Sequence, residues 1–293
     1  MTDSLGQFQL LEHIDDGGSA DVYRALKRET GDVVALKVLK PALRENPEEV
    51  SRFFDEARFT QGLIHPGIPS SLETGVEDGS PYLAMEFVQG ESLADCLERC
   101  GKFAEEEALS IACDLADTLA YIHRHGVVHR DLKPANIVLR SSDGRAQIMD
   151  FGVARASGAG AEGHMATPRY MSPEQAAGDR VDGRSDLFSL GVILYEMLAG
   201  HPPFESSTLD ALITEVRQTD PAPLSASHSK AAPVITQLLQ KDPAKRYASA
   251  EAARDAMQHR EGNAEAGRRP LGSAGWLAIV GLGVAMAVAW VLL

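Results

Sequence analysis

The chain has 293 residues, enough for a folded unit larger than one average domain together with an appended segment. Its 44% hydrophobic and 24% charged residues argue against a wholly disordered protein. Its formal net charge of −14 argues against a nucleic-acid-binding protein, because such proteins present a basic face or stripe.

Three cysteines lie in segments that are predicted to be helical, Cys96, Cys100 and Cys113, and they do not have the spacing of a disulfide framework. Cys96 and Cys100 are one helical turn apart, so a metal-binding or redox pair is the alternative interpretation. No second pair with zinc-like spacing accompanies them, so we expect ordinary reduced thiols in a reducing compartment.

Residues 8–39 are predicted to form strands that are separated by turns, the first of them the glycine-containing stretch 15–20. Lys37 lies in the apolar run 33–39, where a charged side chain on the inward face is costly unless it meets a counter-charge. The following segment, 47–63, is predicted to be a helix, because it has proline near its start and acids in its first turn.

Two further strands are expected around Leu72 and over 81–87, after which the hydrophobic periodicity becomes helical from Ser92. A helix is expected over 105–125. His123, His125 and His129 raise the alternative of a metal site, but the carboxylate pattern of a metallohydrolase is missing, so we interpret them as structural.

Residues 127–139 consist of a β-prone pair, a polar loop and a second β-prone run. The loop carries a carboxylate at Asp131, a cation at Lys133 and an amide at Asn136. Phosphoryl transfer needs these groups: a base for the attacking hydroxyl, a cation for the moving phosphoryl, and an oxygen ligand for magnesium. Another acid, Asp150, follows a short predicted strand and begins the sequence Asp-Phe-Gly.

The stretch 129–136 matches the protein-kinase catalytic loop H-R-D-x-K-P-x-N, and Val34-Ala35-Leu36-Lys37 and Asp150-Phe151-Gly152 match two further kinase motifs. Over residues 8–260 the chain therefore resembles a bacterial Hanks-type serine/threonine protein kinase. The resemblance implies an α+β, bilobal fold with a small β-rich N-lobe (8–86), a hinge (87–90) and a larger helical C-lobe (91–260).

The resemblance also implies a role for each catalytic residue. Asp131 would orient the substrate hydroxyl, Lys133 would stabilise the γ-phosphoryl group, and Asn136 and Asp150 would hold Mg²⁺, or alternatively Mn²⁺. Lys37, held by Glu56, would contact the ATP phosphates. The remaining residues implied to contact ATP are Ile14, Gly17, Val22, Ala35, Met85, Glu86, Val88 and Leu139.

Other family motifs are recognisable further along the chain. The segment 167–174 resembles the end of a kinase activation segment, and Thr167 implies serine/threonine rather than tyrosine specificity. Glu174 is expected to pair with Arg246, and Asp186 to brace the backbone of the catalytic loop. Ser157 is the only hydroxyl residue between Gly152 and Thr167, so switching by loop phosphorylation and a loop ordered without phosphate both remain open.

The clearest departure from the family is the phosphate-binding loop, where G-x-G-x-x-G falls on Asp15, Gly17 and Ala20. Only the middle glycine is retained, which supports the alternative of a pseudokinase scaffold with weakened nucleotide binding. The complete set of catalytic residues favours an active kinase. A small-molecule phosphotransferase is disfavoured, because the peptide-docking segment 167–174 would be superfluous.

Residues 270–293 contain no charged residue, and we expect a linker over 261–272 followed by a transmembrane helix over 273–293. The alternative is a buried helix, which we disfavour because no further chain follows to cover it. Arg268 and Arg269 predict a single-pass inner-membrane protein with its kinase domain in the cytoplasm. The expected partners are Ser/Thr protein substrates, including the chain itself, and no nucleic acid; small residues at 281, 285 and 289 would permit a homodimer.

Overall fold

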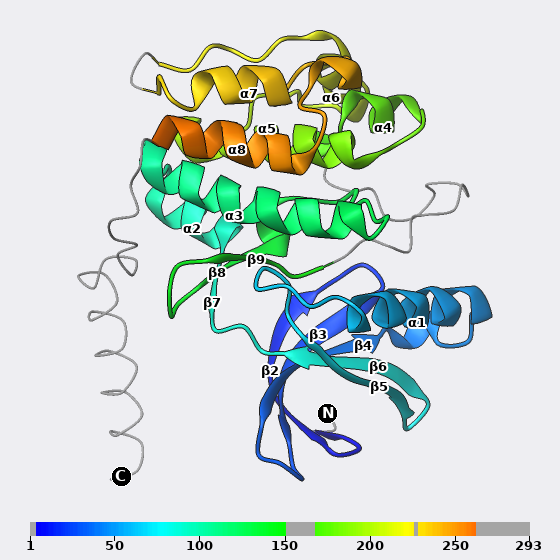
Figure 1. Ribbon diagram of the computed structural model, residues 1–293. Coiled ribbons are helices and arrows are strands. Elements are labelled where there is room, and N and C mark those ends of the chain that lie inside the picture. Colours follow the sequence, from blue (N-terminus) through cyan, green and yellow to red (C-terminus); the bar gives the residue numbers. More distant parts are fainter. Residues whose placement is uncertain (1–3, 151–167, 226–227, 262–293) are drawn as a thin grey trace.

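The computed structural model describes residues 4–150, 168–225 and 228–261, and these form two lobes (Figure 1). The smaller N-terminal lobe is a β-sheet with one long helix beside it. The larger C-terminal lobe is mainly helical. The bilobal α+β fold expected from the sequence is therefore confirmed.

The N-terminal lobe contains a six-stranded antiparallel sheet in the order β1-β2-β3-β4-β6-β5. Its strands are β1 (Ser4–Leu5), β2 (Phe8–Asp16), β3 (Ala20–Lys27), β4 (Val33–Leu39), β5 (Ser71–Glu77) and β6 (Ser80–Glu86). A 3₁₀ turn, η1 (Pro41–Leu43), and helix α1 (Pro47–Gln61) follow β4. Pro47 at its first position and two acids in its first turn favour the start of α1 at this point.

Strand β4 is buried on both faces, and its residues alternate between two apolar clusters. One face contributes Val34, Leu36 and Val38 to a cluster with residues of β2, β3 and β6. On the other face, Leu39 packs in a cluster with Phe53 and Ala57 of α1. Lys37 lies two residues before Leu39 and so faces α1 as well.

The C-terminal lobe begins with a three-stranded sheet in the order β7-β8-β9, formed by β7 (Gly90–Ser92), β8 (Ile137–Arg140) and β9 (Ala146–Ile148). Its helices are α2 (Leu93–Cys100), α3 (Glu105–Arg124), α4 (Pro173–Ala177), α5 (Gly183–Ala199), α6 (Leu209–Gln218), α7 (Ala232–Leu238) and α8 (Ala250–Glu261). Short 3₁₀ turns are η2 (Pro134–Asn136), η4 (Pro168–Tyr170) and η5 (Pro243–Lys245).

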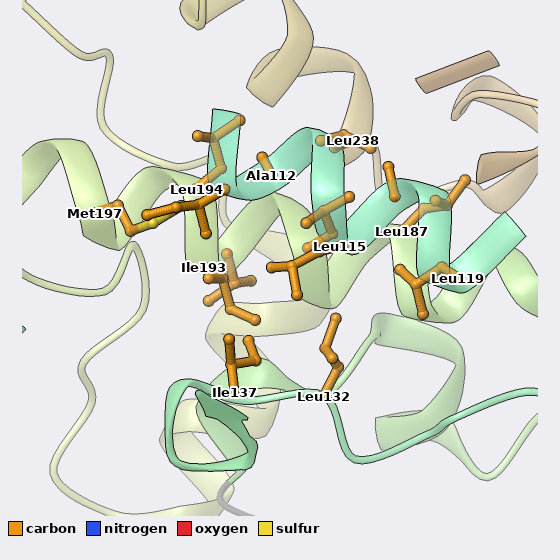
Figure 2. Packing of buried hydrophobic residues seen from close by; sticks show 14 of the residues in the cluster. Ala112, Leu115, Leu119, Leu132, Ile137, Leu187, Ile193, Leu194, Met197 and Leu238 are labelled. Atoms are coloured by element: carbon orange, nitrogen blue, oxygen red, sulfur yellow. The ribbon is translucent and has the colours of Figure 1, made fainter. Parts of the chain in front are cut away.

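Helices α3 and α5 form the centre of this lobe, and their apolar side chains interlock (Figure 2). Asp182 caps the N-terminus of α5, and Gly200 ends it in the left-handed conformation at φ 82°. Leu132, inside the polar loop between Asp131 and Lys133, and Ile137, directly after the loop, are inserted into the same core and are 1% and 0% exposed. Burial of each stabilises the fold by about 1.5–3 kcal/mol, so the core anchors this loop at its middle and at its C-terminal end.

Within the described residues, no helix is long and apolar enough to cross a membrane. The predicted linker and transmembrane span, 261–272 and 273–293, lie outside the described part of the chain except for Glu261, the last residue of α8.

Candidate active site

The central feature between the lobes is an ammonium group held by two carboxylates. Lys37 Nζ of β4 lies 2.6 Å from Glu56 Oε1 of α1 and 2.8 Å from Asp150 Oδ1, which follows β9. The Lys37 and Glu56 side chains are 12% and 16% exposed, whereas the Asp150 side chain is 49% exposed. The structure thus brings together three residues that are widely separated in the sequence, and leaves the Asp150 carboxylate accessible.

The three groups shift one another's pKa values. Burial acts to lower the pKa of Lys37, but the charges of Asp150 and Glu56 outweigh it and raise that pKa above its ordinary value. The same ammonium holds the pKa of Asp150 well below its usual range. Burial raises the pKa of Glu56, and the positive charge of Lys37 opposes this shift. At neutral pH the site therefore contains a protonated lysine beside an ionised Asp150.

Strand register places the residues implied to contact ATP around Lys37. Val22 of β3 is the direct cross-strand neighbour of Lys37, and Met85 of β6 is the neighbour of Ala35. Since directly paired residues point to the same face, Val22, Ala35 and Met85 share the face of Lys37.

The other residues of this set come from both lobes. Val88 and Leu139 are buried, at 9% and 2% exposure, and Glu86 is partly buried with its backbone N–H donating to the Ser70 carbonyl. Ile14, near the end of β2, differs from them because it remains 47% exposed.

The phosphate-binding loop expected from the sequence is a tight turn over residues 17–19 between β2 and β3. A Cβ atom on Gly17 would lie 2.7 Å from the Ala20 carbonyl oxygen, so only glycine fits at this position. Asp15 is exposed at the end of β2. The retained glycine therefore has a steric reason, and the acid in place of the first glycine faces solvent.

The catalytic loop holds its polar residues close together. Lys133 Nζ lies 3.2 Å from Asp131 Oδ2. Asn136 Nδ2 donates to the Asp131 carbonyl at 3.0 Å, which turns the amide oxygen of Asn136 away from that carbonyl. The Met149 N–H donates to the Asn136 carbonyl at 2.9 Å, so the residue before Asp150 is tied to this loop.

A buried carboxylate on α5 supports the loop from beneath. Asp186 is 0% exposed and accepts hydrogen bonds from the backbone N–H groups of His129 at 2.9 Å and Arg130 at 2.8 Å. Arg130 has φ +66°, a left-handed conformation that non-glycine residues rarely adopt. His123 Nε2 lies 2.8 Å from the same carboxylate. The expected bracing of the catalytic loop by Asp186 is present.

The sequence did not indicate Gln175 as a contributor to this support. Its side-chain oxygen accepts from the Ser172 N–H in a capping box, and its Nε2 donates to the Arg130 carbonyl at 2.9 Å. The Ser-Pro-Glu-Gln sequence is a capping-box signal that was available beforehand, but the second contact depends on the tertiary fold.

The predicted pair of Glu174 and Arg246 is also present and is almost completely buried. Arg246 Nη1 and Nη2 donate to the two carboxylate oxygens at 2.7 and 2.8 Å. Backbone carbonyls of Arg184, Gln240 and Lys241 accept the other three N–H groups. Every donor of this buried guanidinium is thus satisfied.

Asn136 and Asp150 offer amide and carboxylate oxygens, the ligand type that Mg²⁺ and Mn²⁺ take, and the backbone contact described above keeps them adjacent. The residues present therefore fit a divalent ion.

The histidines have other partners, since His123 contacts Asp186 and His125 contacts the Tyr121 carbonyl. Phe151, Gly152, Ser157 and Thr167 lie outside the described residues.

Residues 8–260 match the protein kinase domain family. Serine/threonine-protein kinase PknB of Mycolicibacterium smegmatis is 37% identical over 273 residues, covering 88% of this chain and 44% of PknB. The PknB of Mycobacterium tuberculosis is 36% identical over 258 residues, covering 83% and 41% of the two chains. The chain therefore spans less than half the length of these curated relatives.

A solved structure is also similar to this chain in its fold. The crystal structure of the Mycobacterium tuberculosis PknI kinase domain superposes with a TM-score of 0.69 at 29% identity, covering 88% of this chain and 97% of that one.

Proposed function

The chain belongs to the protein kinase family, with the enzyme class of a serine/threonine protein kinase, and on this premise we propose that it is catalytically active and transfers the γ-phosphoryl group of ATP to Ser or Thr hydroxyls of protein substrates. The observation that carries the proposal is the contact of Lys37 with both Glu56 and Asp150. A buried lysine paired in this way is poised to bind phosphate, and a scaffold has no chemical need to keep it.

In this proposal Lys37 positions the α- and β-phosphates, and Glu56 fixes the direction of its ammonium group. Asp131 orients the substrate hydroxyl and accepts its proton, while Lys133 stabilises charge on the moving phosphoryl group. A divalent ion held by Asn136 and Asp150 would supply the positive charge that neutralises the phosphates. The remaining proposed ATP contacts are Ile14, Gly17, Val22, Ala35, Met85, Glu86, Val88 and Leu139.

The test is incubation of the purified full-length chain with labelled ATP and Mg²⁺, followed by identification of the phosphorylated residues. We expect label on serine and threonine of the chain itself and of a general protein substrate. Label confined to tyrosine, or no label in the presence of measurable ATP binding, would contradict the proposal. Mapping also decides whether Ser157 or Thr167 is used.

The altered phosphate-binding turn supports a second candidate, a pseudokinase scaffold. Asp15 places an exposed carboxylate beside this turn, and Ala20 replaces a further glycine. Lys37→Met separates the two functions in cells. Loss of the cellular response that depends on this chain supports catalysis, and a full response in cells that carry the variant supports the scaffold.

We further propose that residues 273–293 anchor the kinase domain to the inner face of the membrane, supported by the uncharged composition of this segment and the two preceding arginines. Pairing of two such anchors would bring one kinase domain to another as its substrate. The test compares membrane fractions from cells that express the full chain or the chain without 273–293. We expect only the full chain to remain in the membrane after alkaline extraction; equal release of both would contradict the anchor.

A further inference from the structure

One lysine contacts the phosphate-binding turn and the strands on both sides of it. Lys40 follows directly after β4, and its backbone N–H donates to the carbonyl of Ser19 in the turn at 3.0 Å. Its ammonium group forms an ion pair with Asp16, the last residue of β2, and lies 3.7 Å from the Asp21 carboxylate in β3. Lys40 thus connects the strand before the turn, the turn itself and the strand after it.

The charges around this turn explain why such a contact matters. Three carboxylates, Asp15, Asp16 and Asp21, lie in or next to the segment that would cover a triphosphate. A carboxylate on the face of the nucleotide would repel it. Strand register separates these acids. Asp15 pairs with Val22 and so shares the face of Lys37, whereas Asp16 pairs with Asp21, and Asp21 with Val38, on the opposite face, where Lys40 contacts both carboxylates.

Steric limits at the turn add to this argument. Gly17 has no room for a side chain, and the other two glycine positions of the family pattern are occupied by Asp15 and Ala20. The turn therefore depends on a small set of fixed contacts for its position. The contacts made by Lys40 join the turn to the end of β4, the strand that carries Lys37.

We propose that Lys40 is a positioning residue for ATP binding: its ammonium group joins Asp16 of β2 to Asp21 of β3 and so fixes the turn over residues 17–19, which would cover the nucleotide. This inference rests on the proposed kinase function. It assigns to Lys40 an effect on the binding of ATP and not on the transfer step, because Lys40 lies outside the set formed by Lys37, Asp131 and Asp150.

The test measures the Kd for Mg²⁺-ATP and the kcat of the full-length chain with Lys40→Met. Lys40→Met removes the ammonium group and keeps the backbone N–H that donates to Ser19, so we expect a modest rise of about fivefold in Kd and in KM for ATP, with kcat within about twofold of wild type. Lys40→Arg keeps the charge and should restore the wild-type Kd. Without nucleotide, amide hydrogen exchange over residues 17–20 should be faster in Lys40→Met.

Lys27 supplies a matched control, because it forms an ion pair of the same type with Glu73 at 2.5 Å in the same sheet, away from the turn. Lys27→Met should leave the Kd for ATP unchanged. If Lys40→Met behaves like Lys27→Met, or lowers thermal stability and kcat without changing the Kd, the positioning role is wrong. If wild type binds ATP but transfers no phosphate, the proposed function fails while the Kd comparison still tests Lys40; if wild type binds no ATP, both fail.

Discussion

Asp15 is the single residue that most clearly separates this site from its family pattern. Its side chain is exposed next to the turn in which Gly17 is sterically required. A carboxylate at that point repels a triphosphate through solvent, whereas a glycine would not. The chain therefore keeps the geometry of the turn and departs in its charge.

We predict that Asp15→Asn binds ATP more tightly than wild type, with the Kd lowered by about twofold because one like charge is removed. The difference should shrink as ionic strength rises, since exposed charges are screened. Titration with a fluorescent ATP analogue at two salt concentrations measures both effects. An unchanged or higher Kd at low salt would mean that Asp15 does not oppose binding.

The cysteines provide a second prediction for individual side chains. Cys96 is 3% exposed, and burial together with Glu91 raises the pKa of its thiol to about 12, whereas Cys100 is exposed. Because the thiolate is the reactive form, iodoacetamide at pH 8 should modify Cys100 in the folded protein and leave Cys96 unmodified. Mass spectrometry identifies the labelled residue, and equal labelling of the two would contradict the buried position of Cys96.

Contacts between separate elements hold the C-terminal lobe around the site. Arg246 precedes α8 and pairs with Glu174 of α4, linking two distant segments through a fully satisfied guanidinium. We predict that Arg246→Met lowers the free energy of unfolding by about 3–5 kcal/mol, because it leaves Glu174 buried without its counter-charge. Chemical denaturation measures this; a loss below about 1 kcal/mol would show that the pair is not a major stabilising contact.

The pH dependence of this pair has a definite sign. Burial acts to raise the pKa of Glu174, but the hydrogen bonds from Arg246 and Ser185 outweigh it and the pKa lies below its ordinary value of 4.5. The contribution of the pair to stability is therefore complete above pH 4.5 and is lost as the pH falls below that value. Arg246→Met should show a weaker loss of stability over that acidic range than wild type.

Helix α5 controls the catalytic loop through Asp186. Its two carboxylate oxygens each accept one backbone N–H, from His129 and from Arg130, and these bonds hold the loop. Asp186→Asn keeps only one of the two acceptor oxygens. Because small misplacements of reacting groups are costly, we expect kcat to fall by about 10- to 100-fold with the Kd for ATP unchanged. Steady-state kinetics and ATP titration on one preparation test this, and a parallel loss of both would indicate general unfolding.

Much of this arrangement could be predicted from the sequence, for physical reasons that differ between elements. The alternation of β4 placed Lys37 on the face of α1, and its charge required a partner there, while the family resemblance indicated Glu56 as that partner. The left-handed Arg130 and the contact of Gln175 with its carbonyl could not be predicted, because they depend on how the folded lobe surrounds the loop. The reach of Lys40 to Asp16 depends in the same way on turn geometry.

On the scale of the whole molecule, each lobe contributes one part of the site. The sheet of the N-terminal lobe supplies Lys37 and the turn, while the core of the C-terminal lobe anchors the loop that carries Asp131 (Figures 1 and 2). Separate origins of binding and transfer imply that the two can be changed independently. Variants of the turn should alter ATP affinity, and variants of the loop should alter the rate.

The most direct test of this account compares wild type with Asp131→Asn in both ATP binding and phosphate transfer. We predict that the variant transfers phosphate at least about 100-fold more slowly, because the hydroxyl loses its base, and that its Kd for Mg²⁺-ATP stays within about twofold of wild type. Equal incorporation of label by the two proteins would contradict the assignment of Asp131 as the base and, with it, the proposal that this site transfers the phosphate.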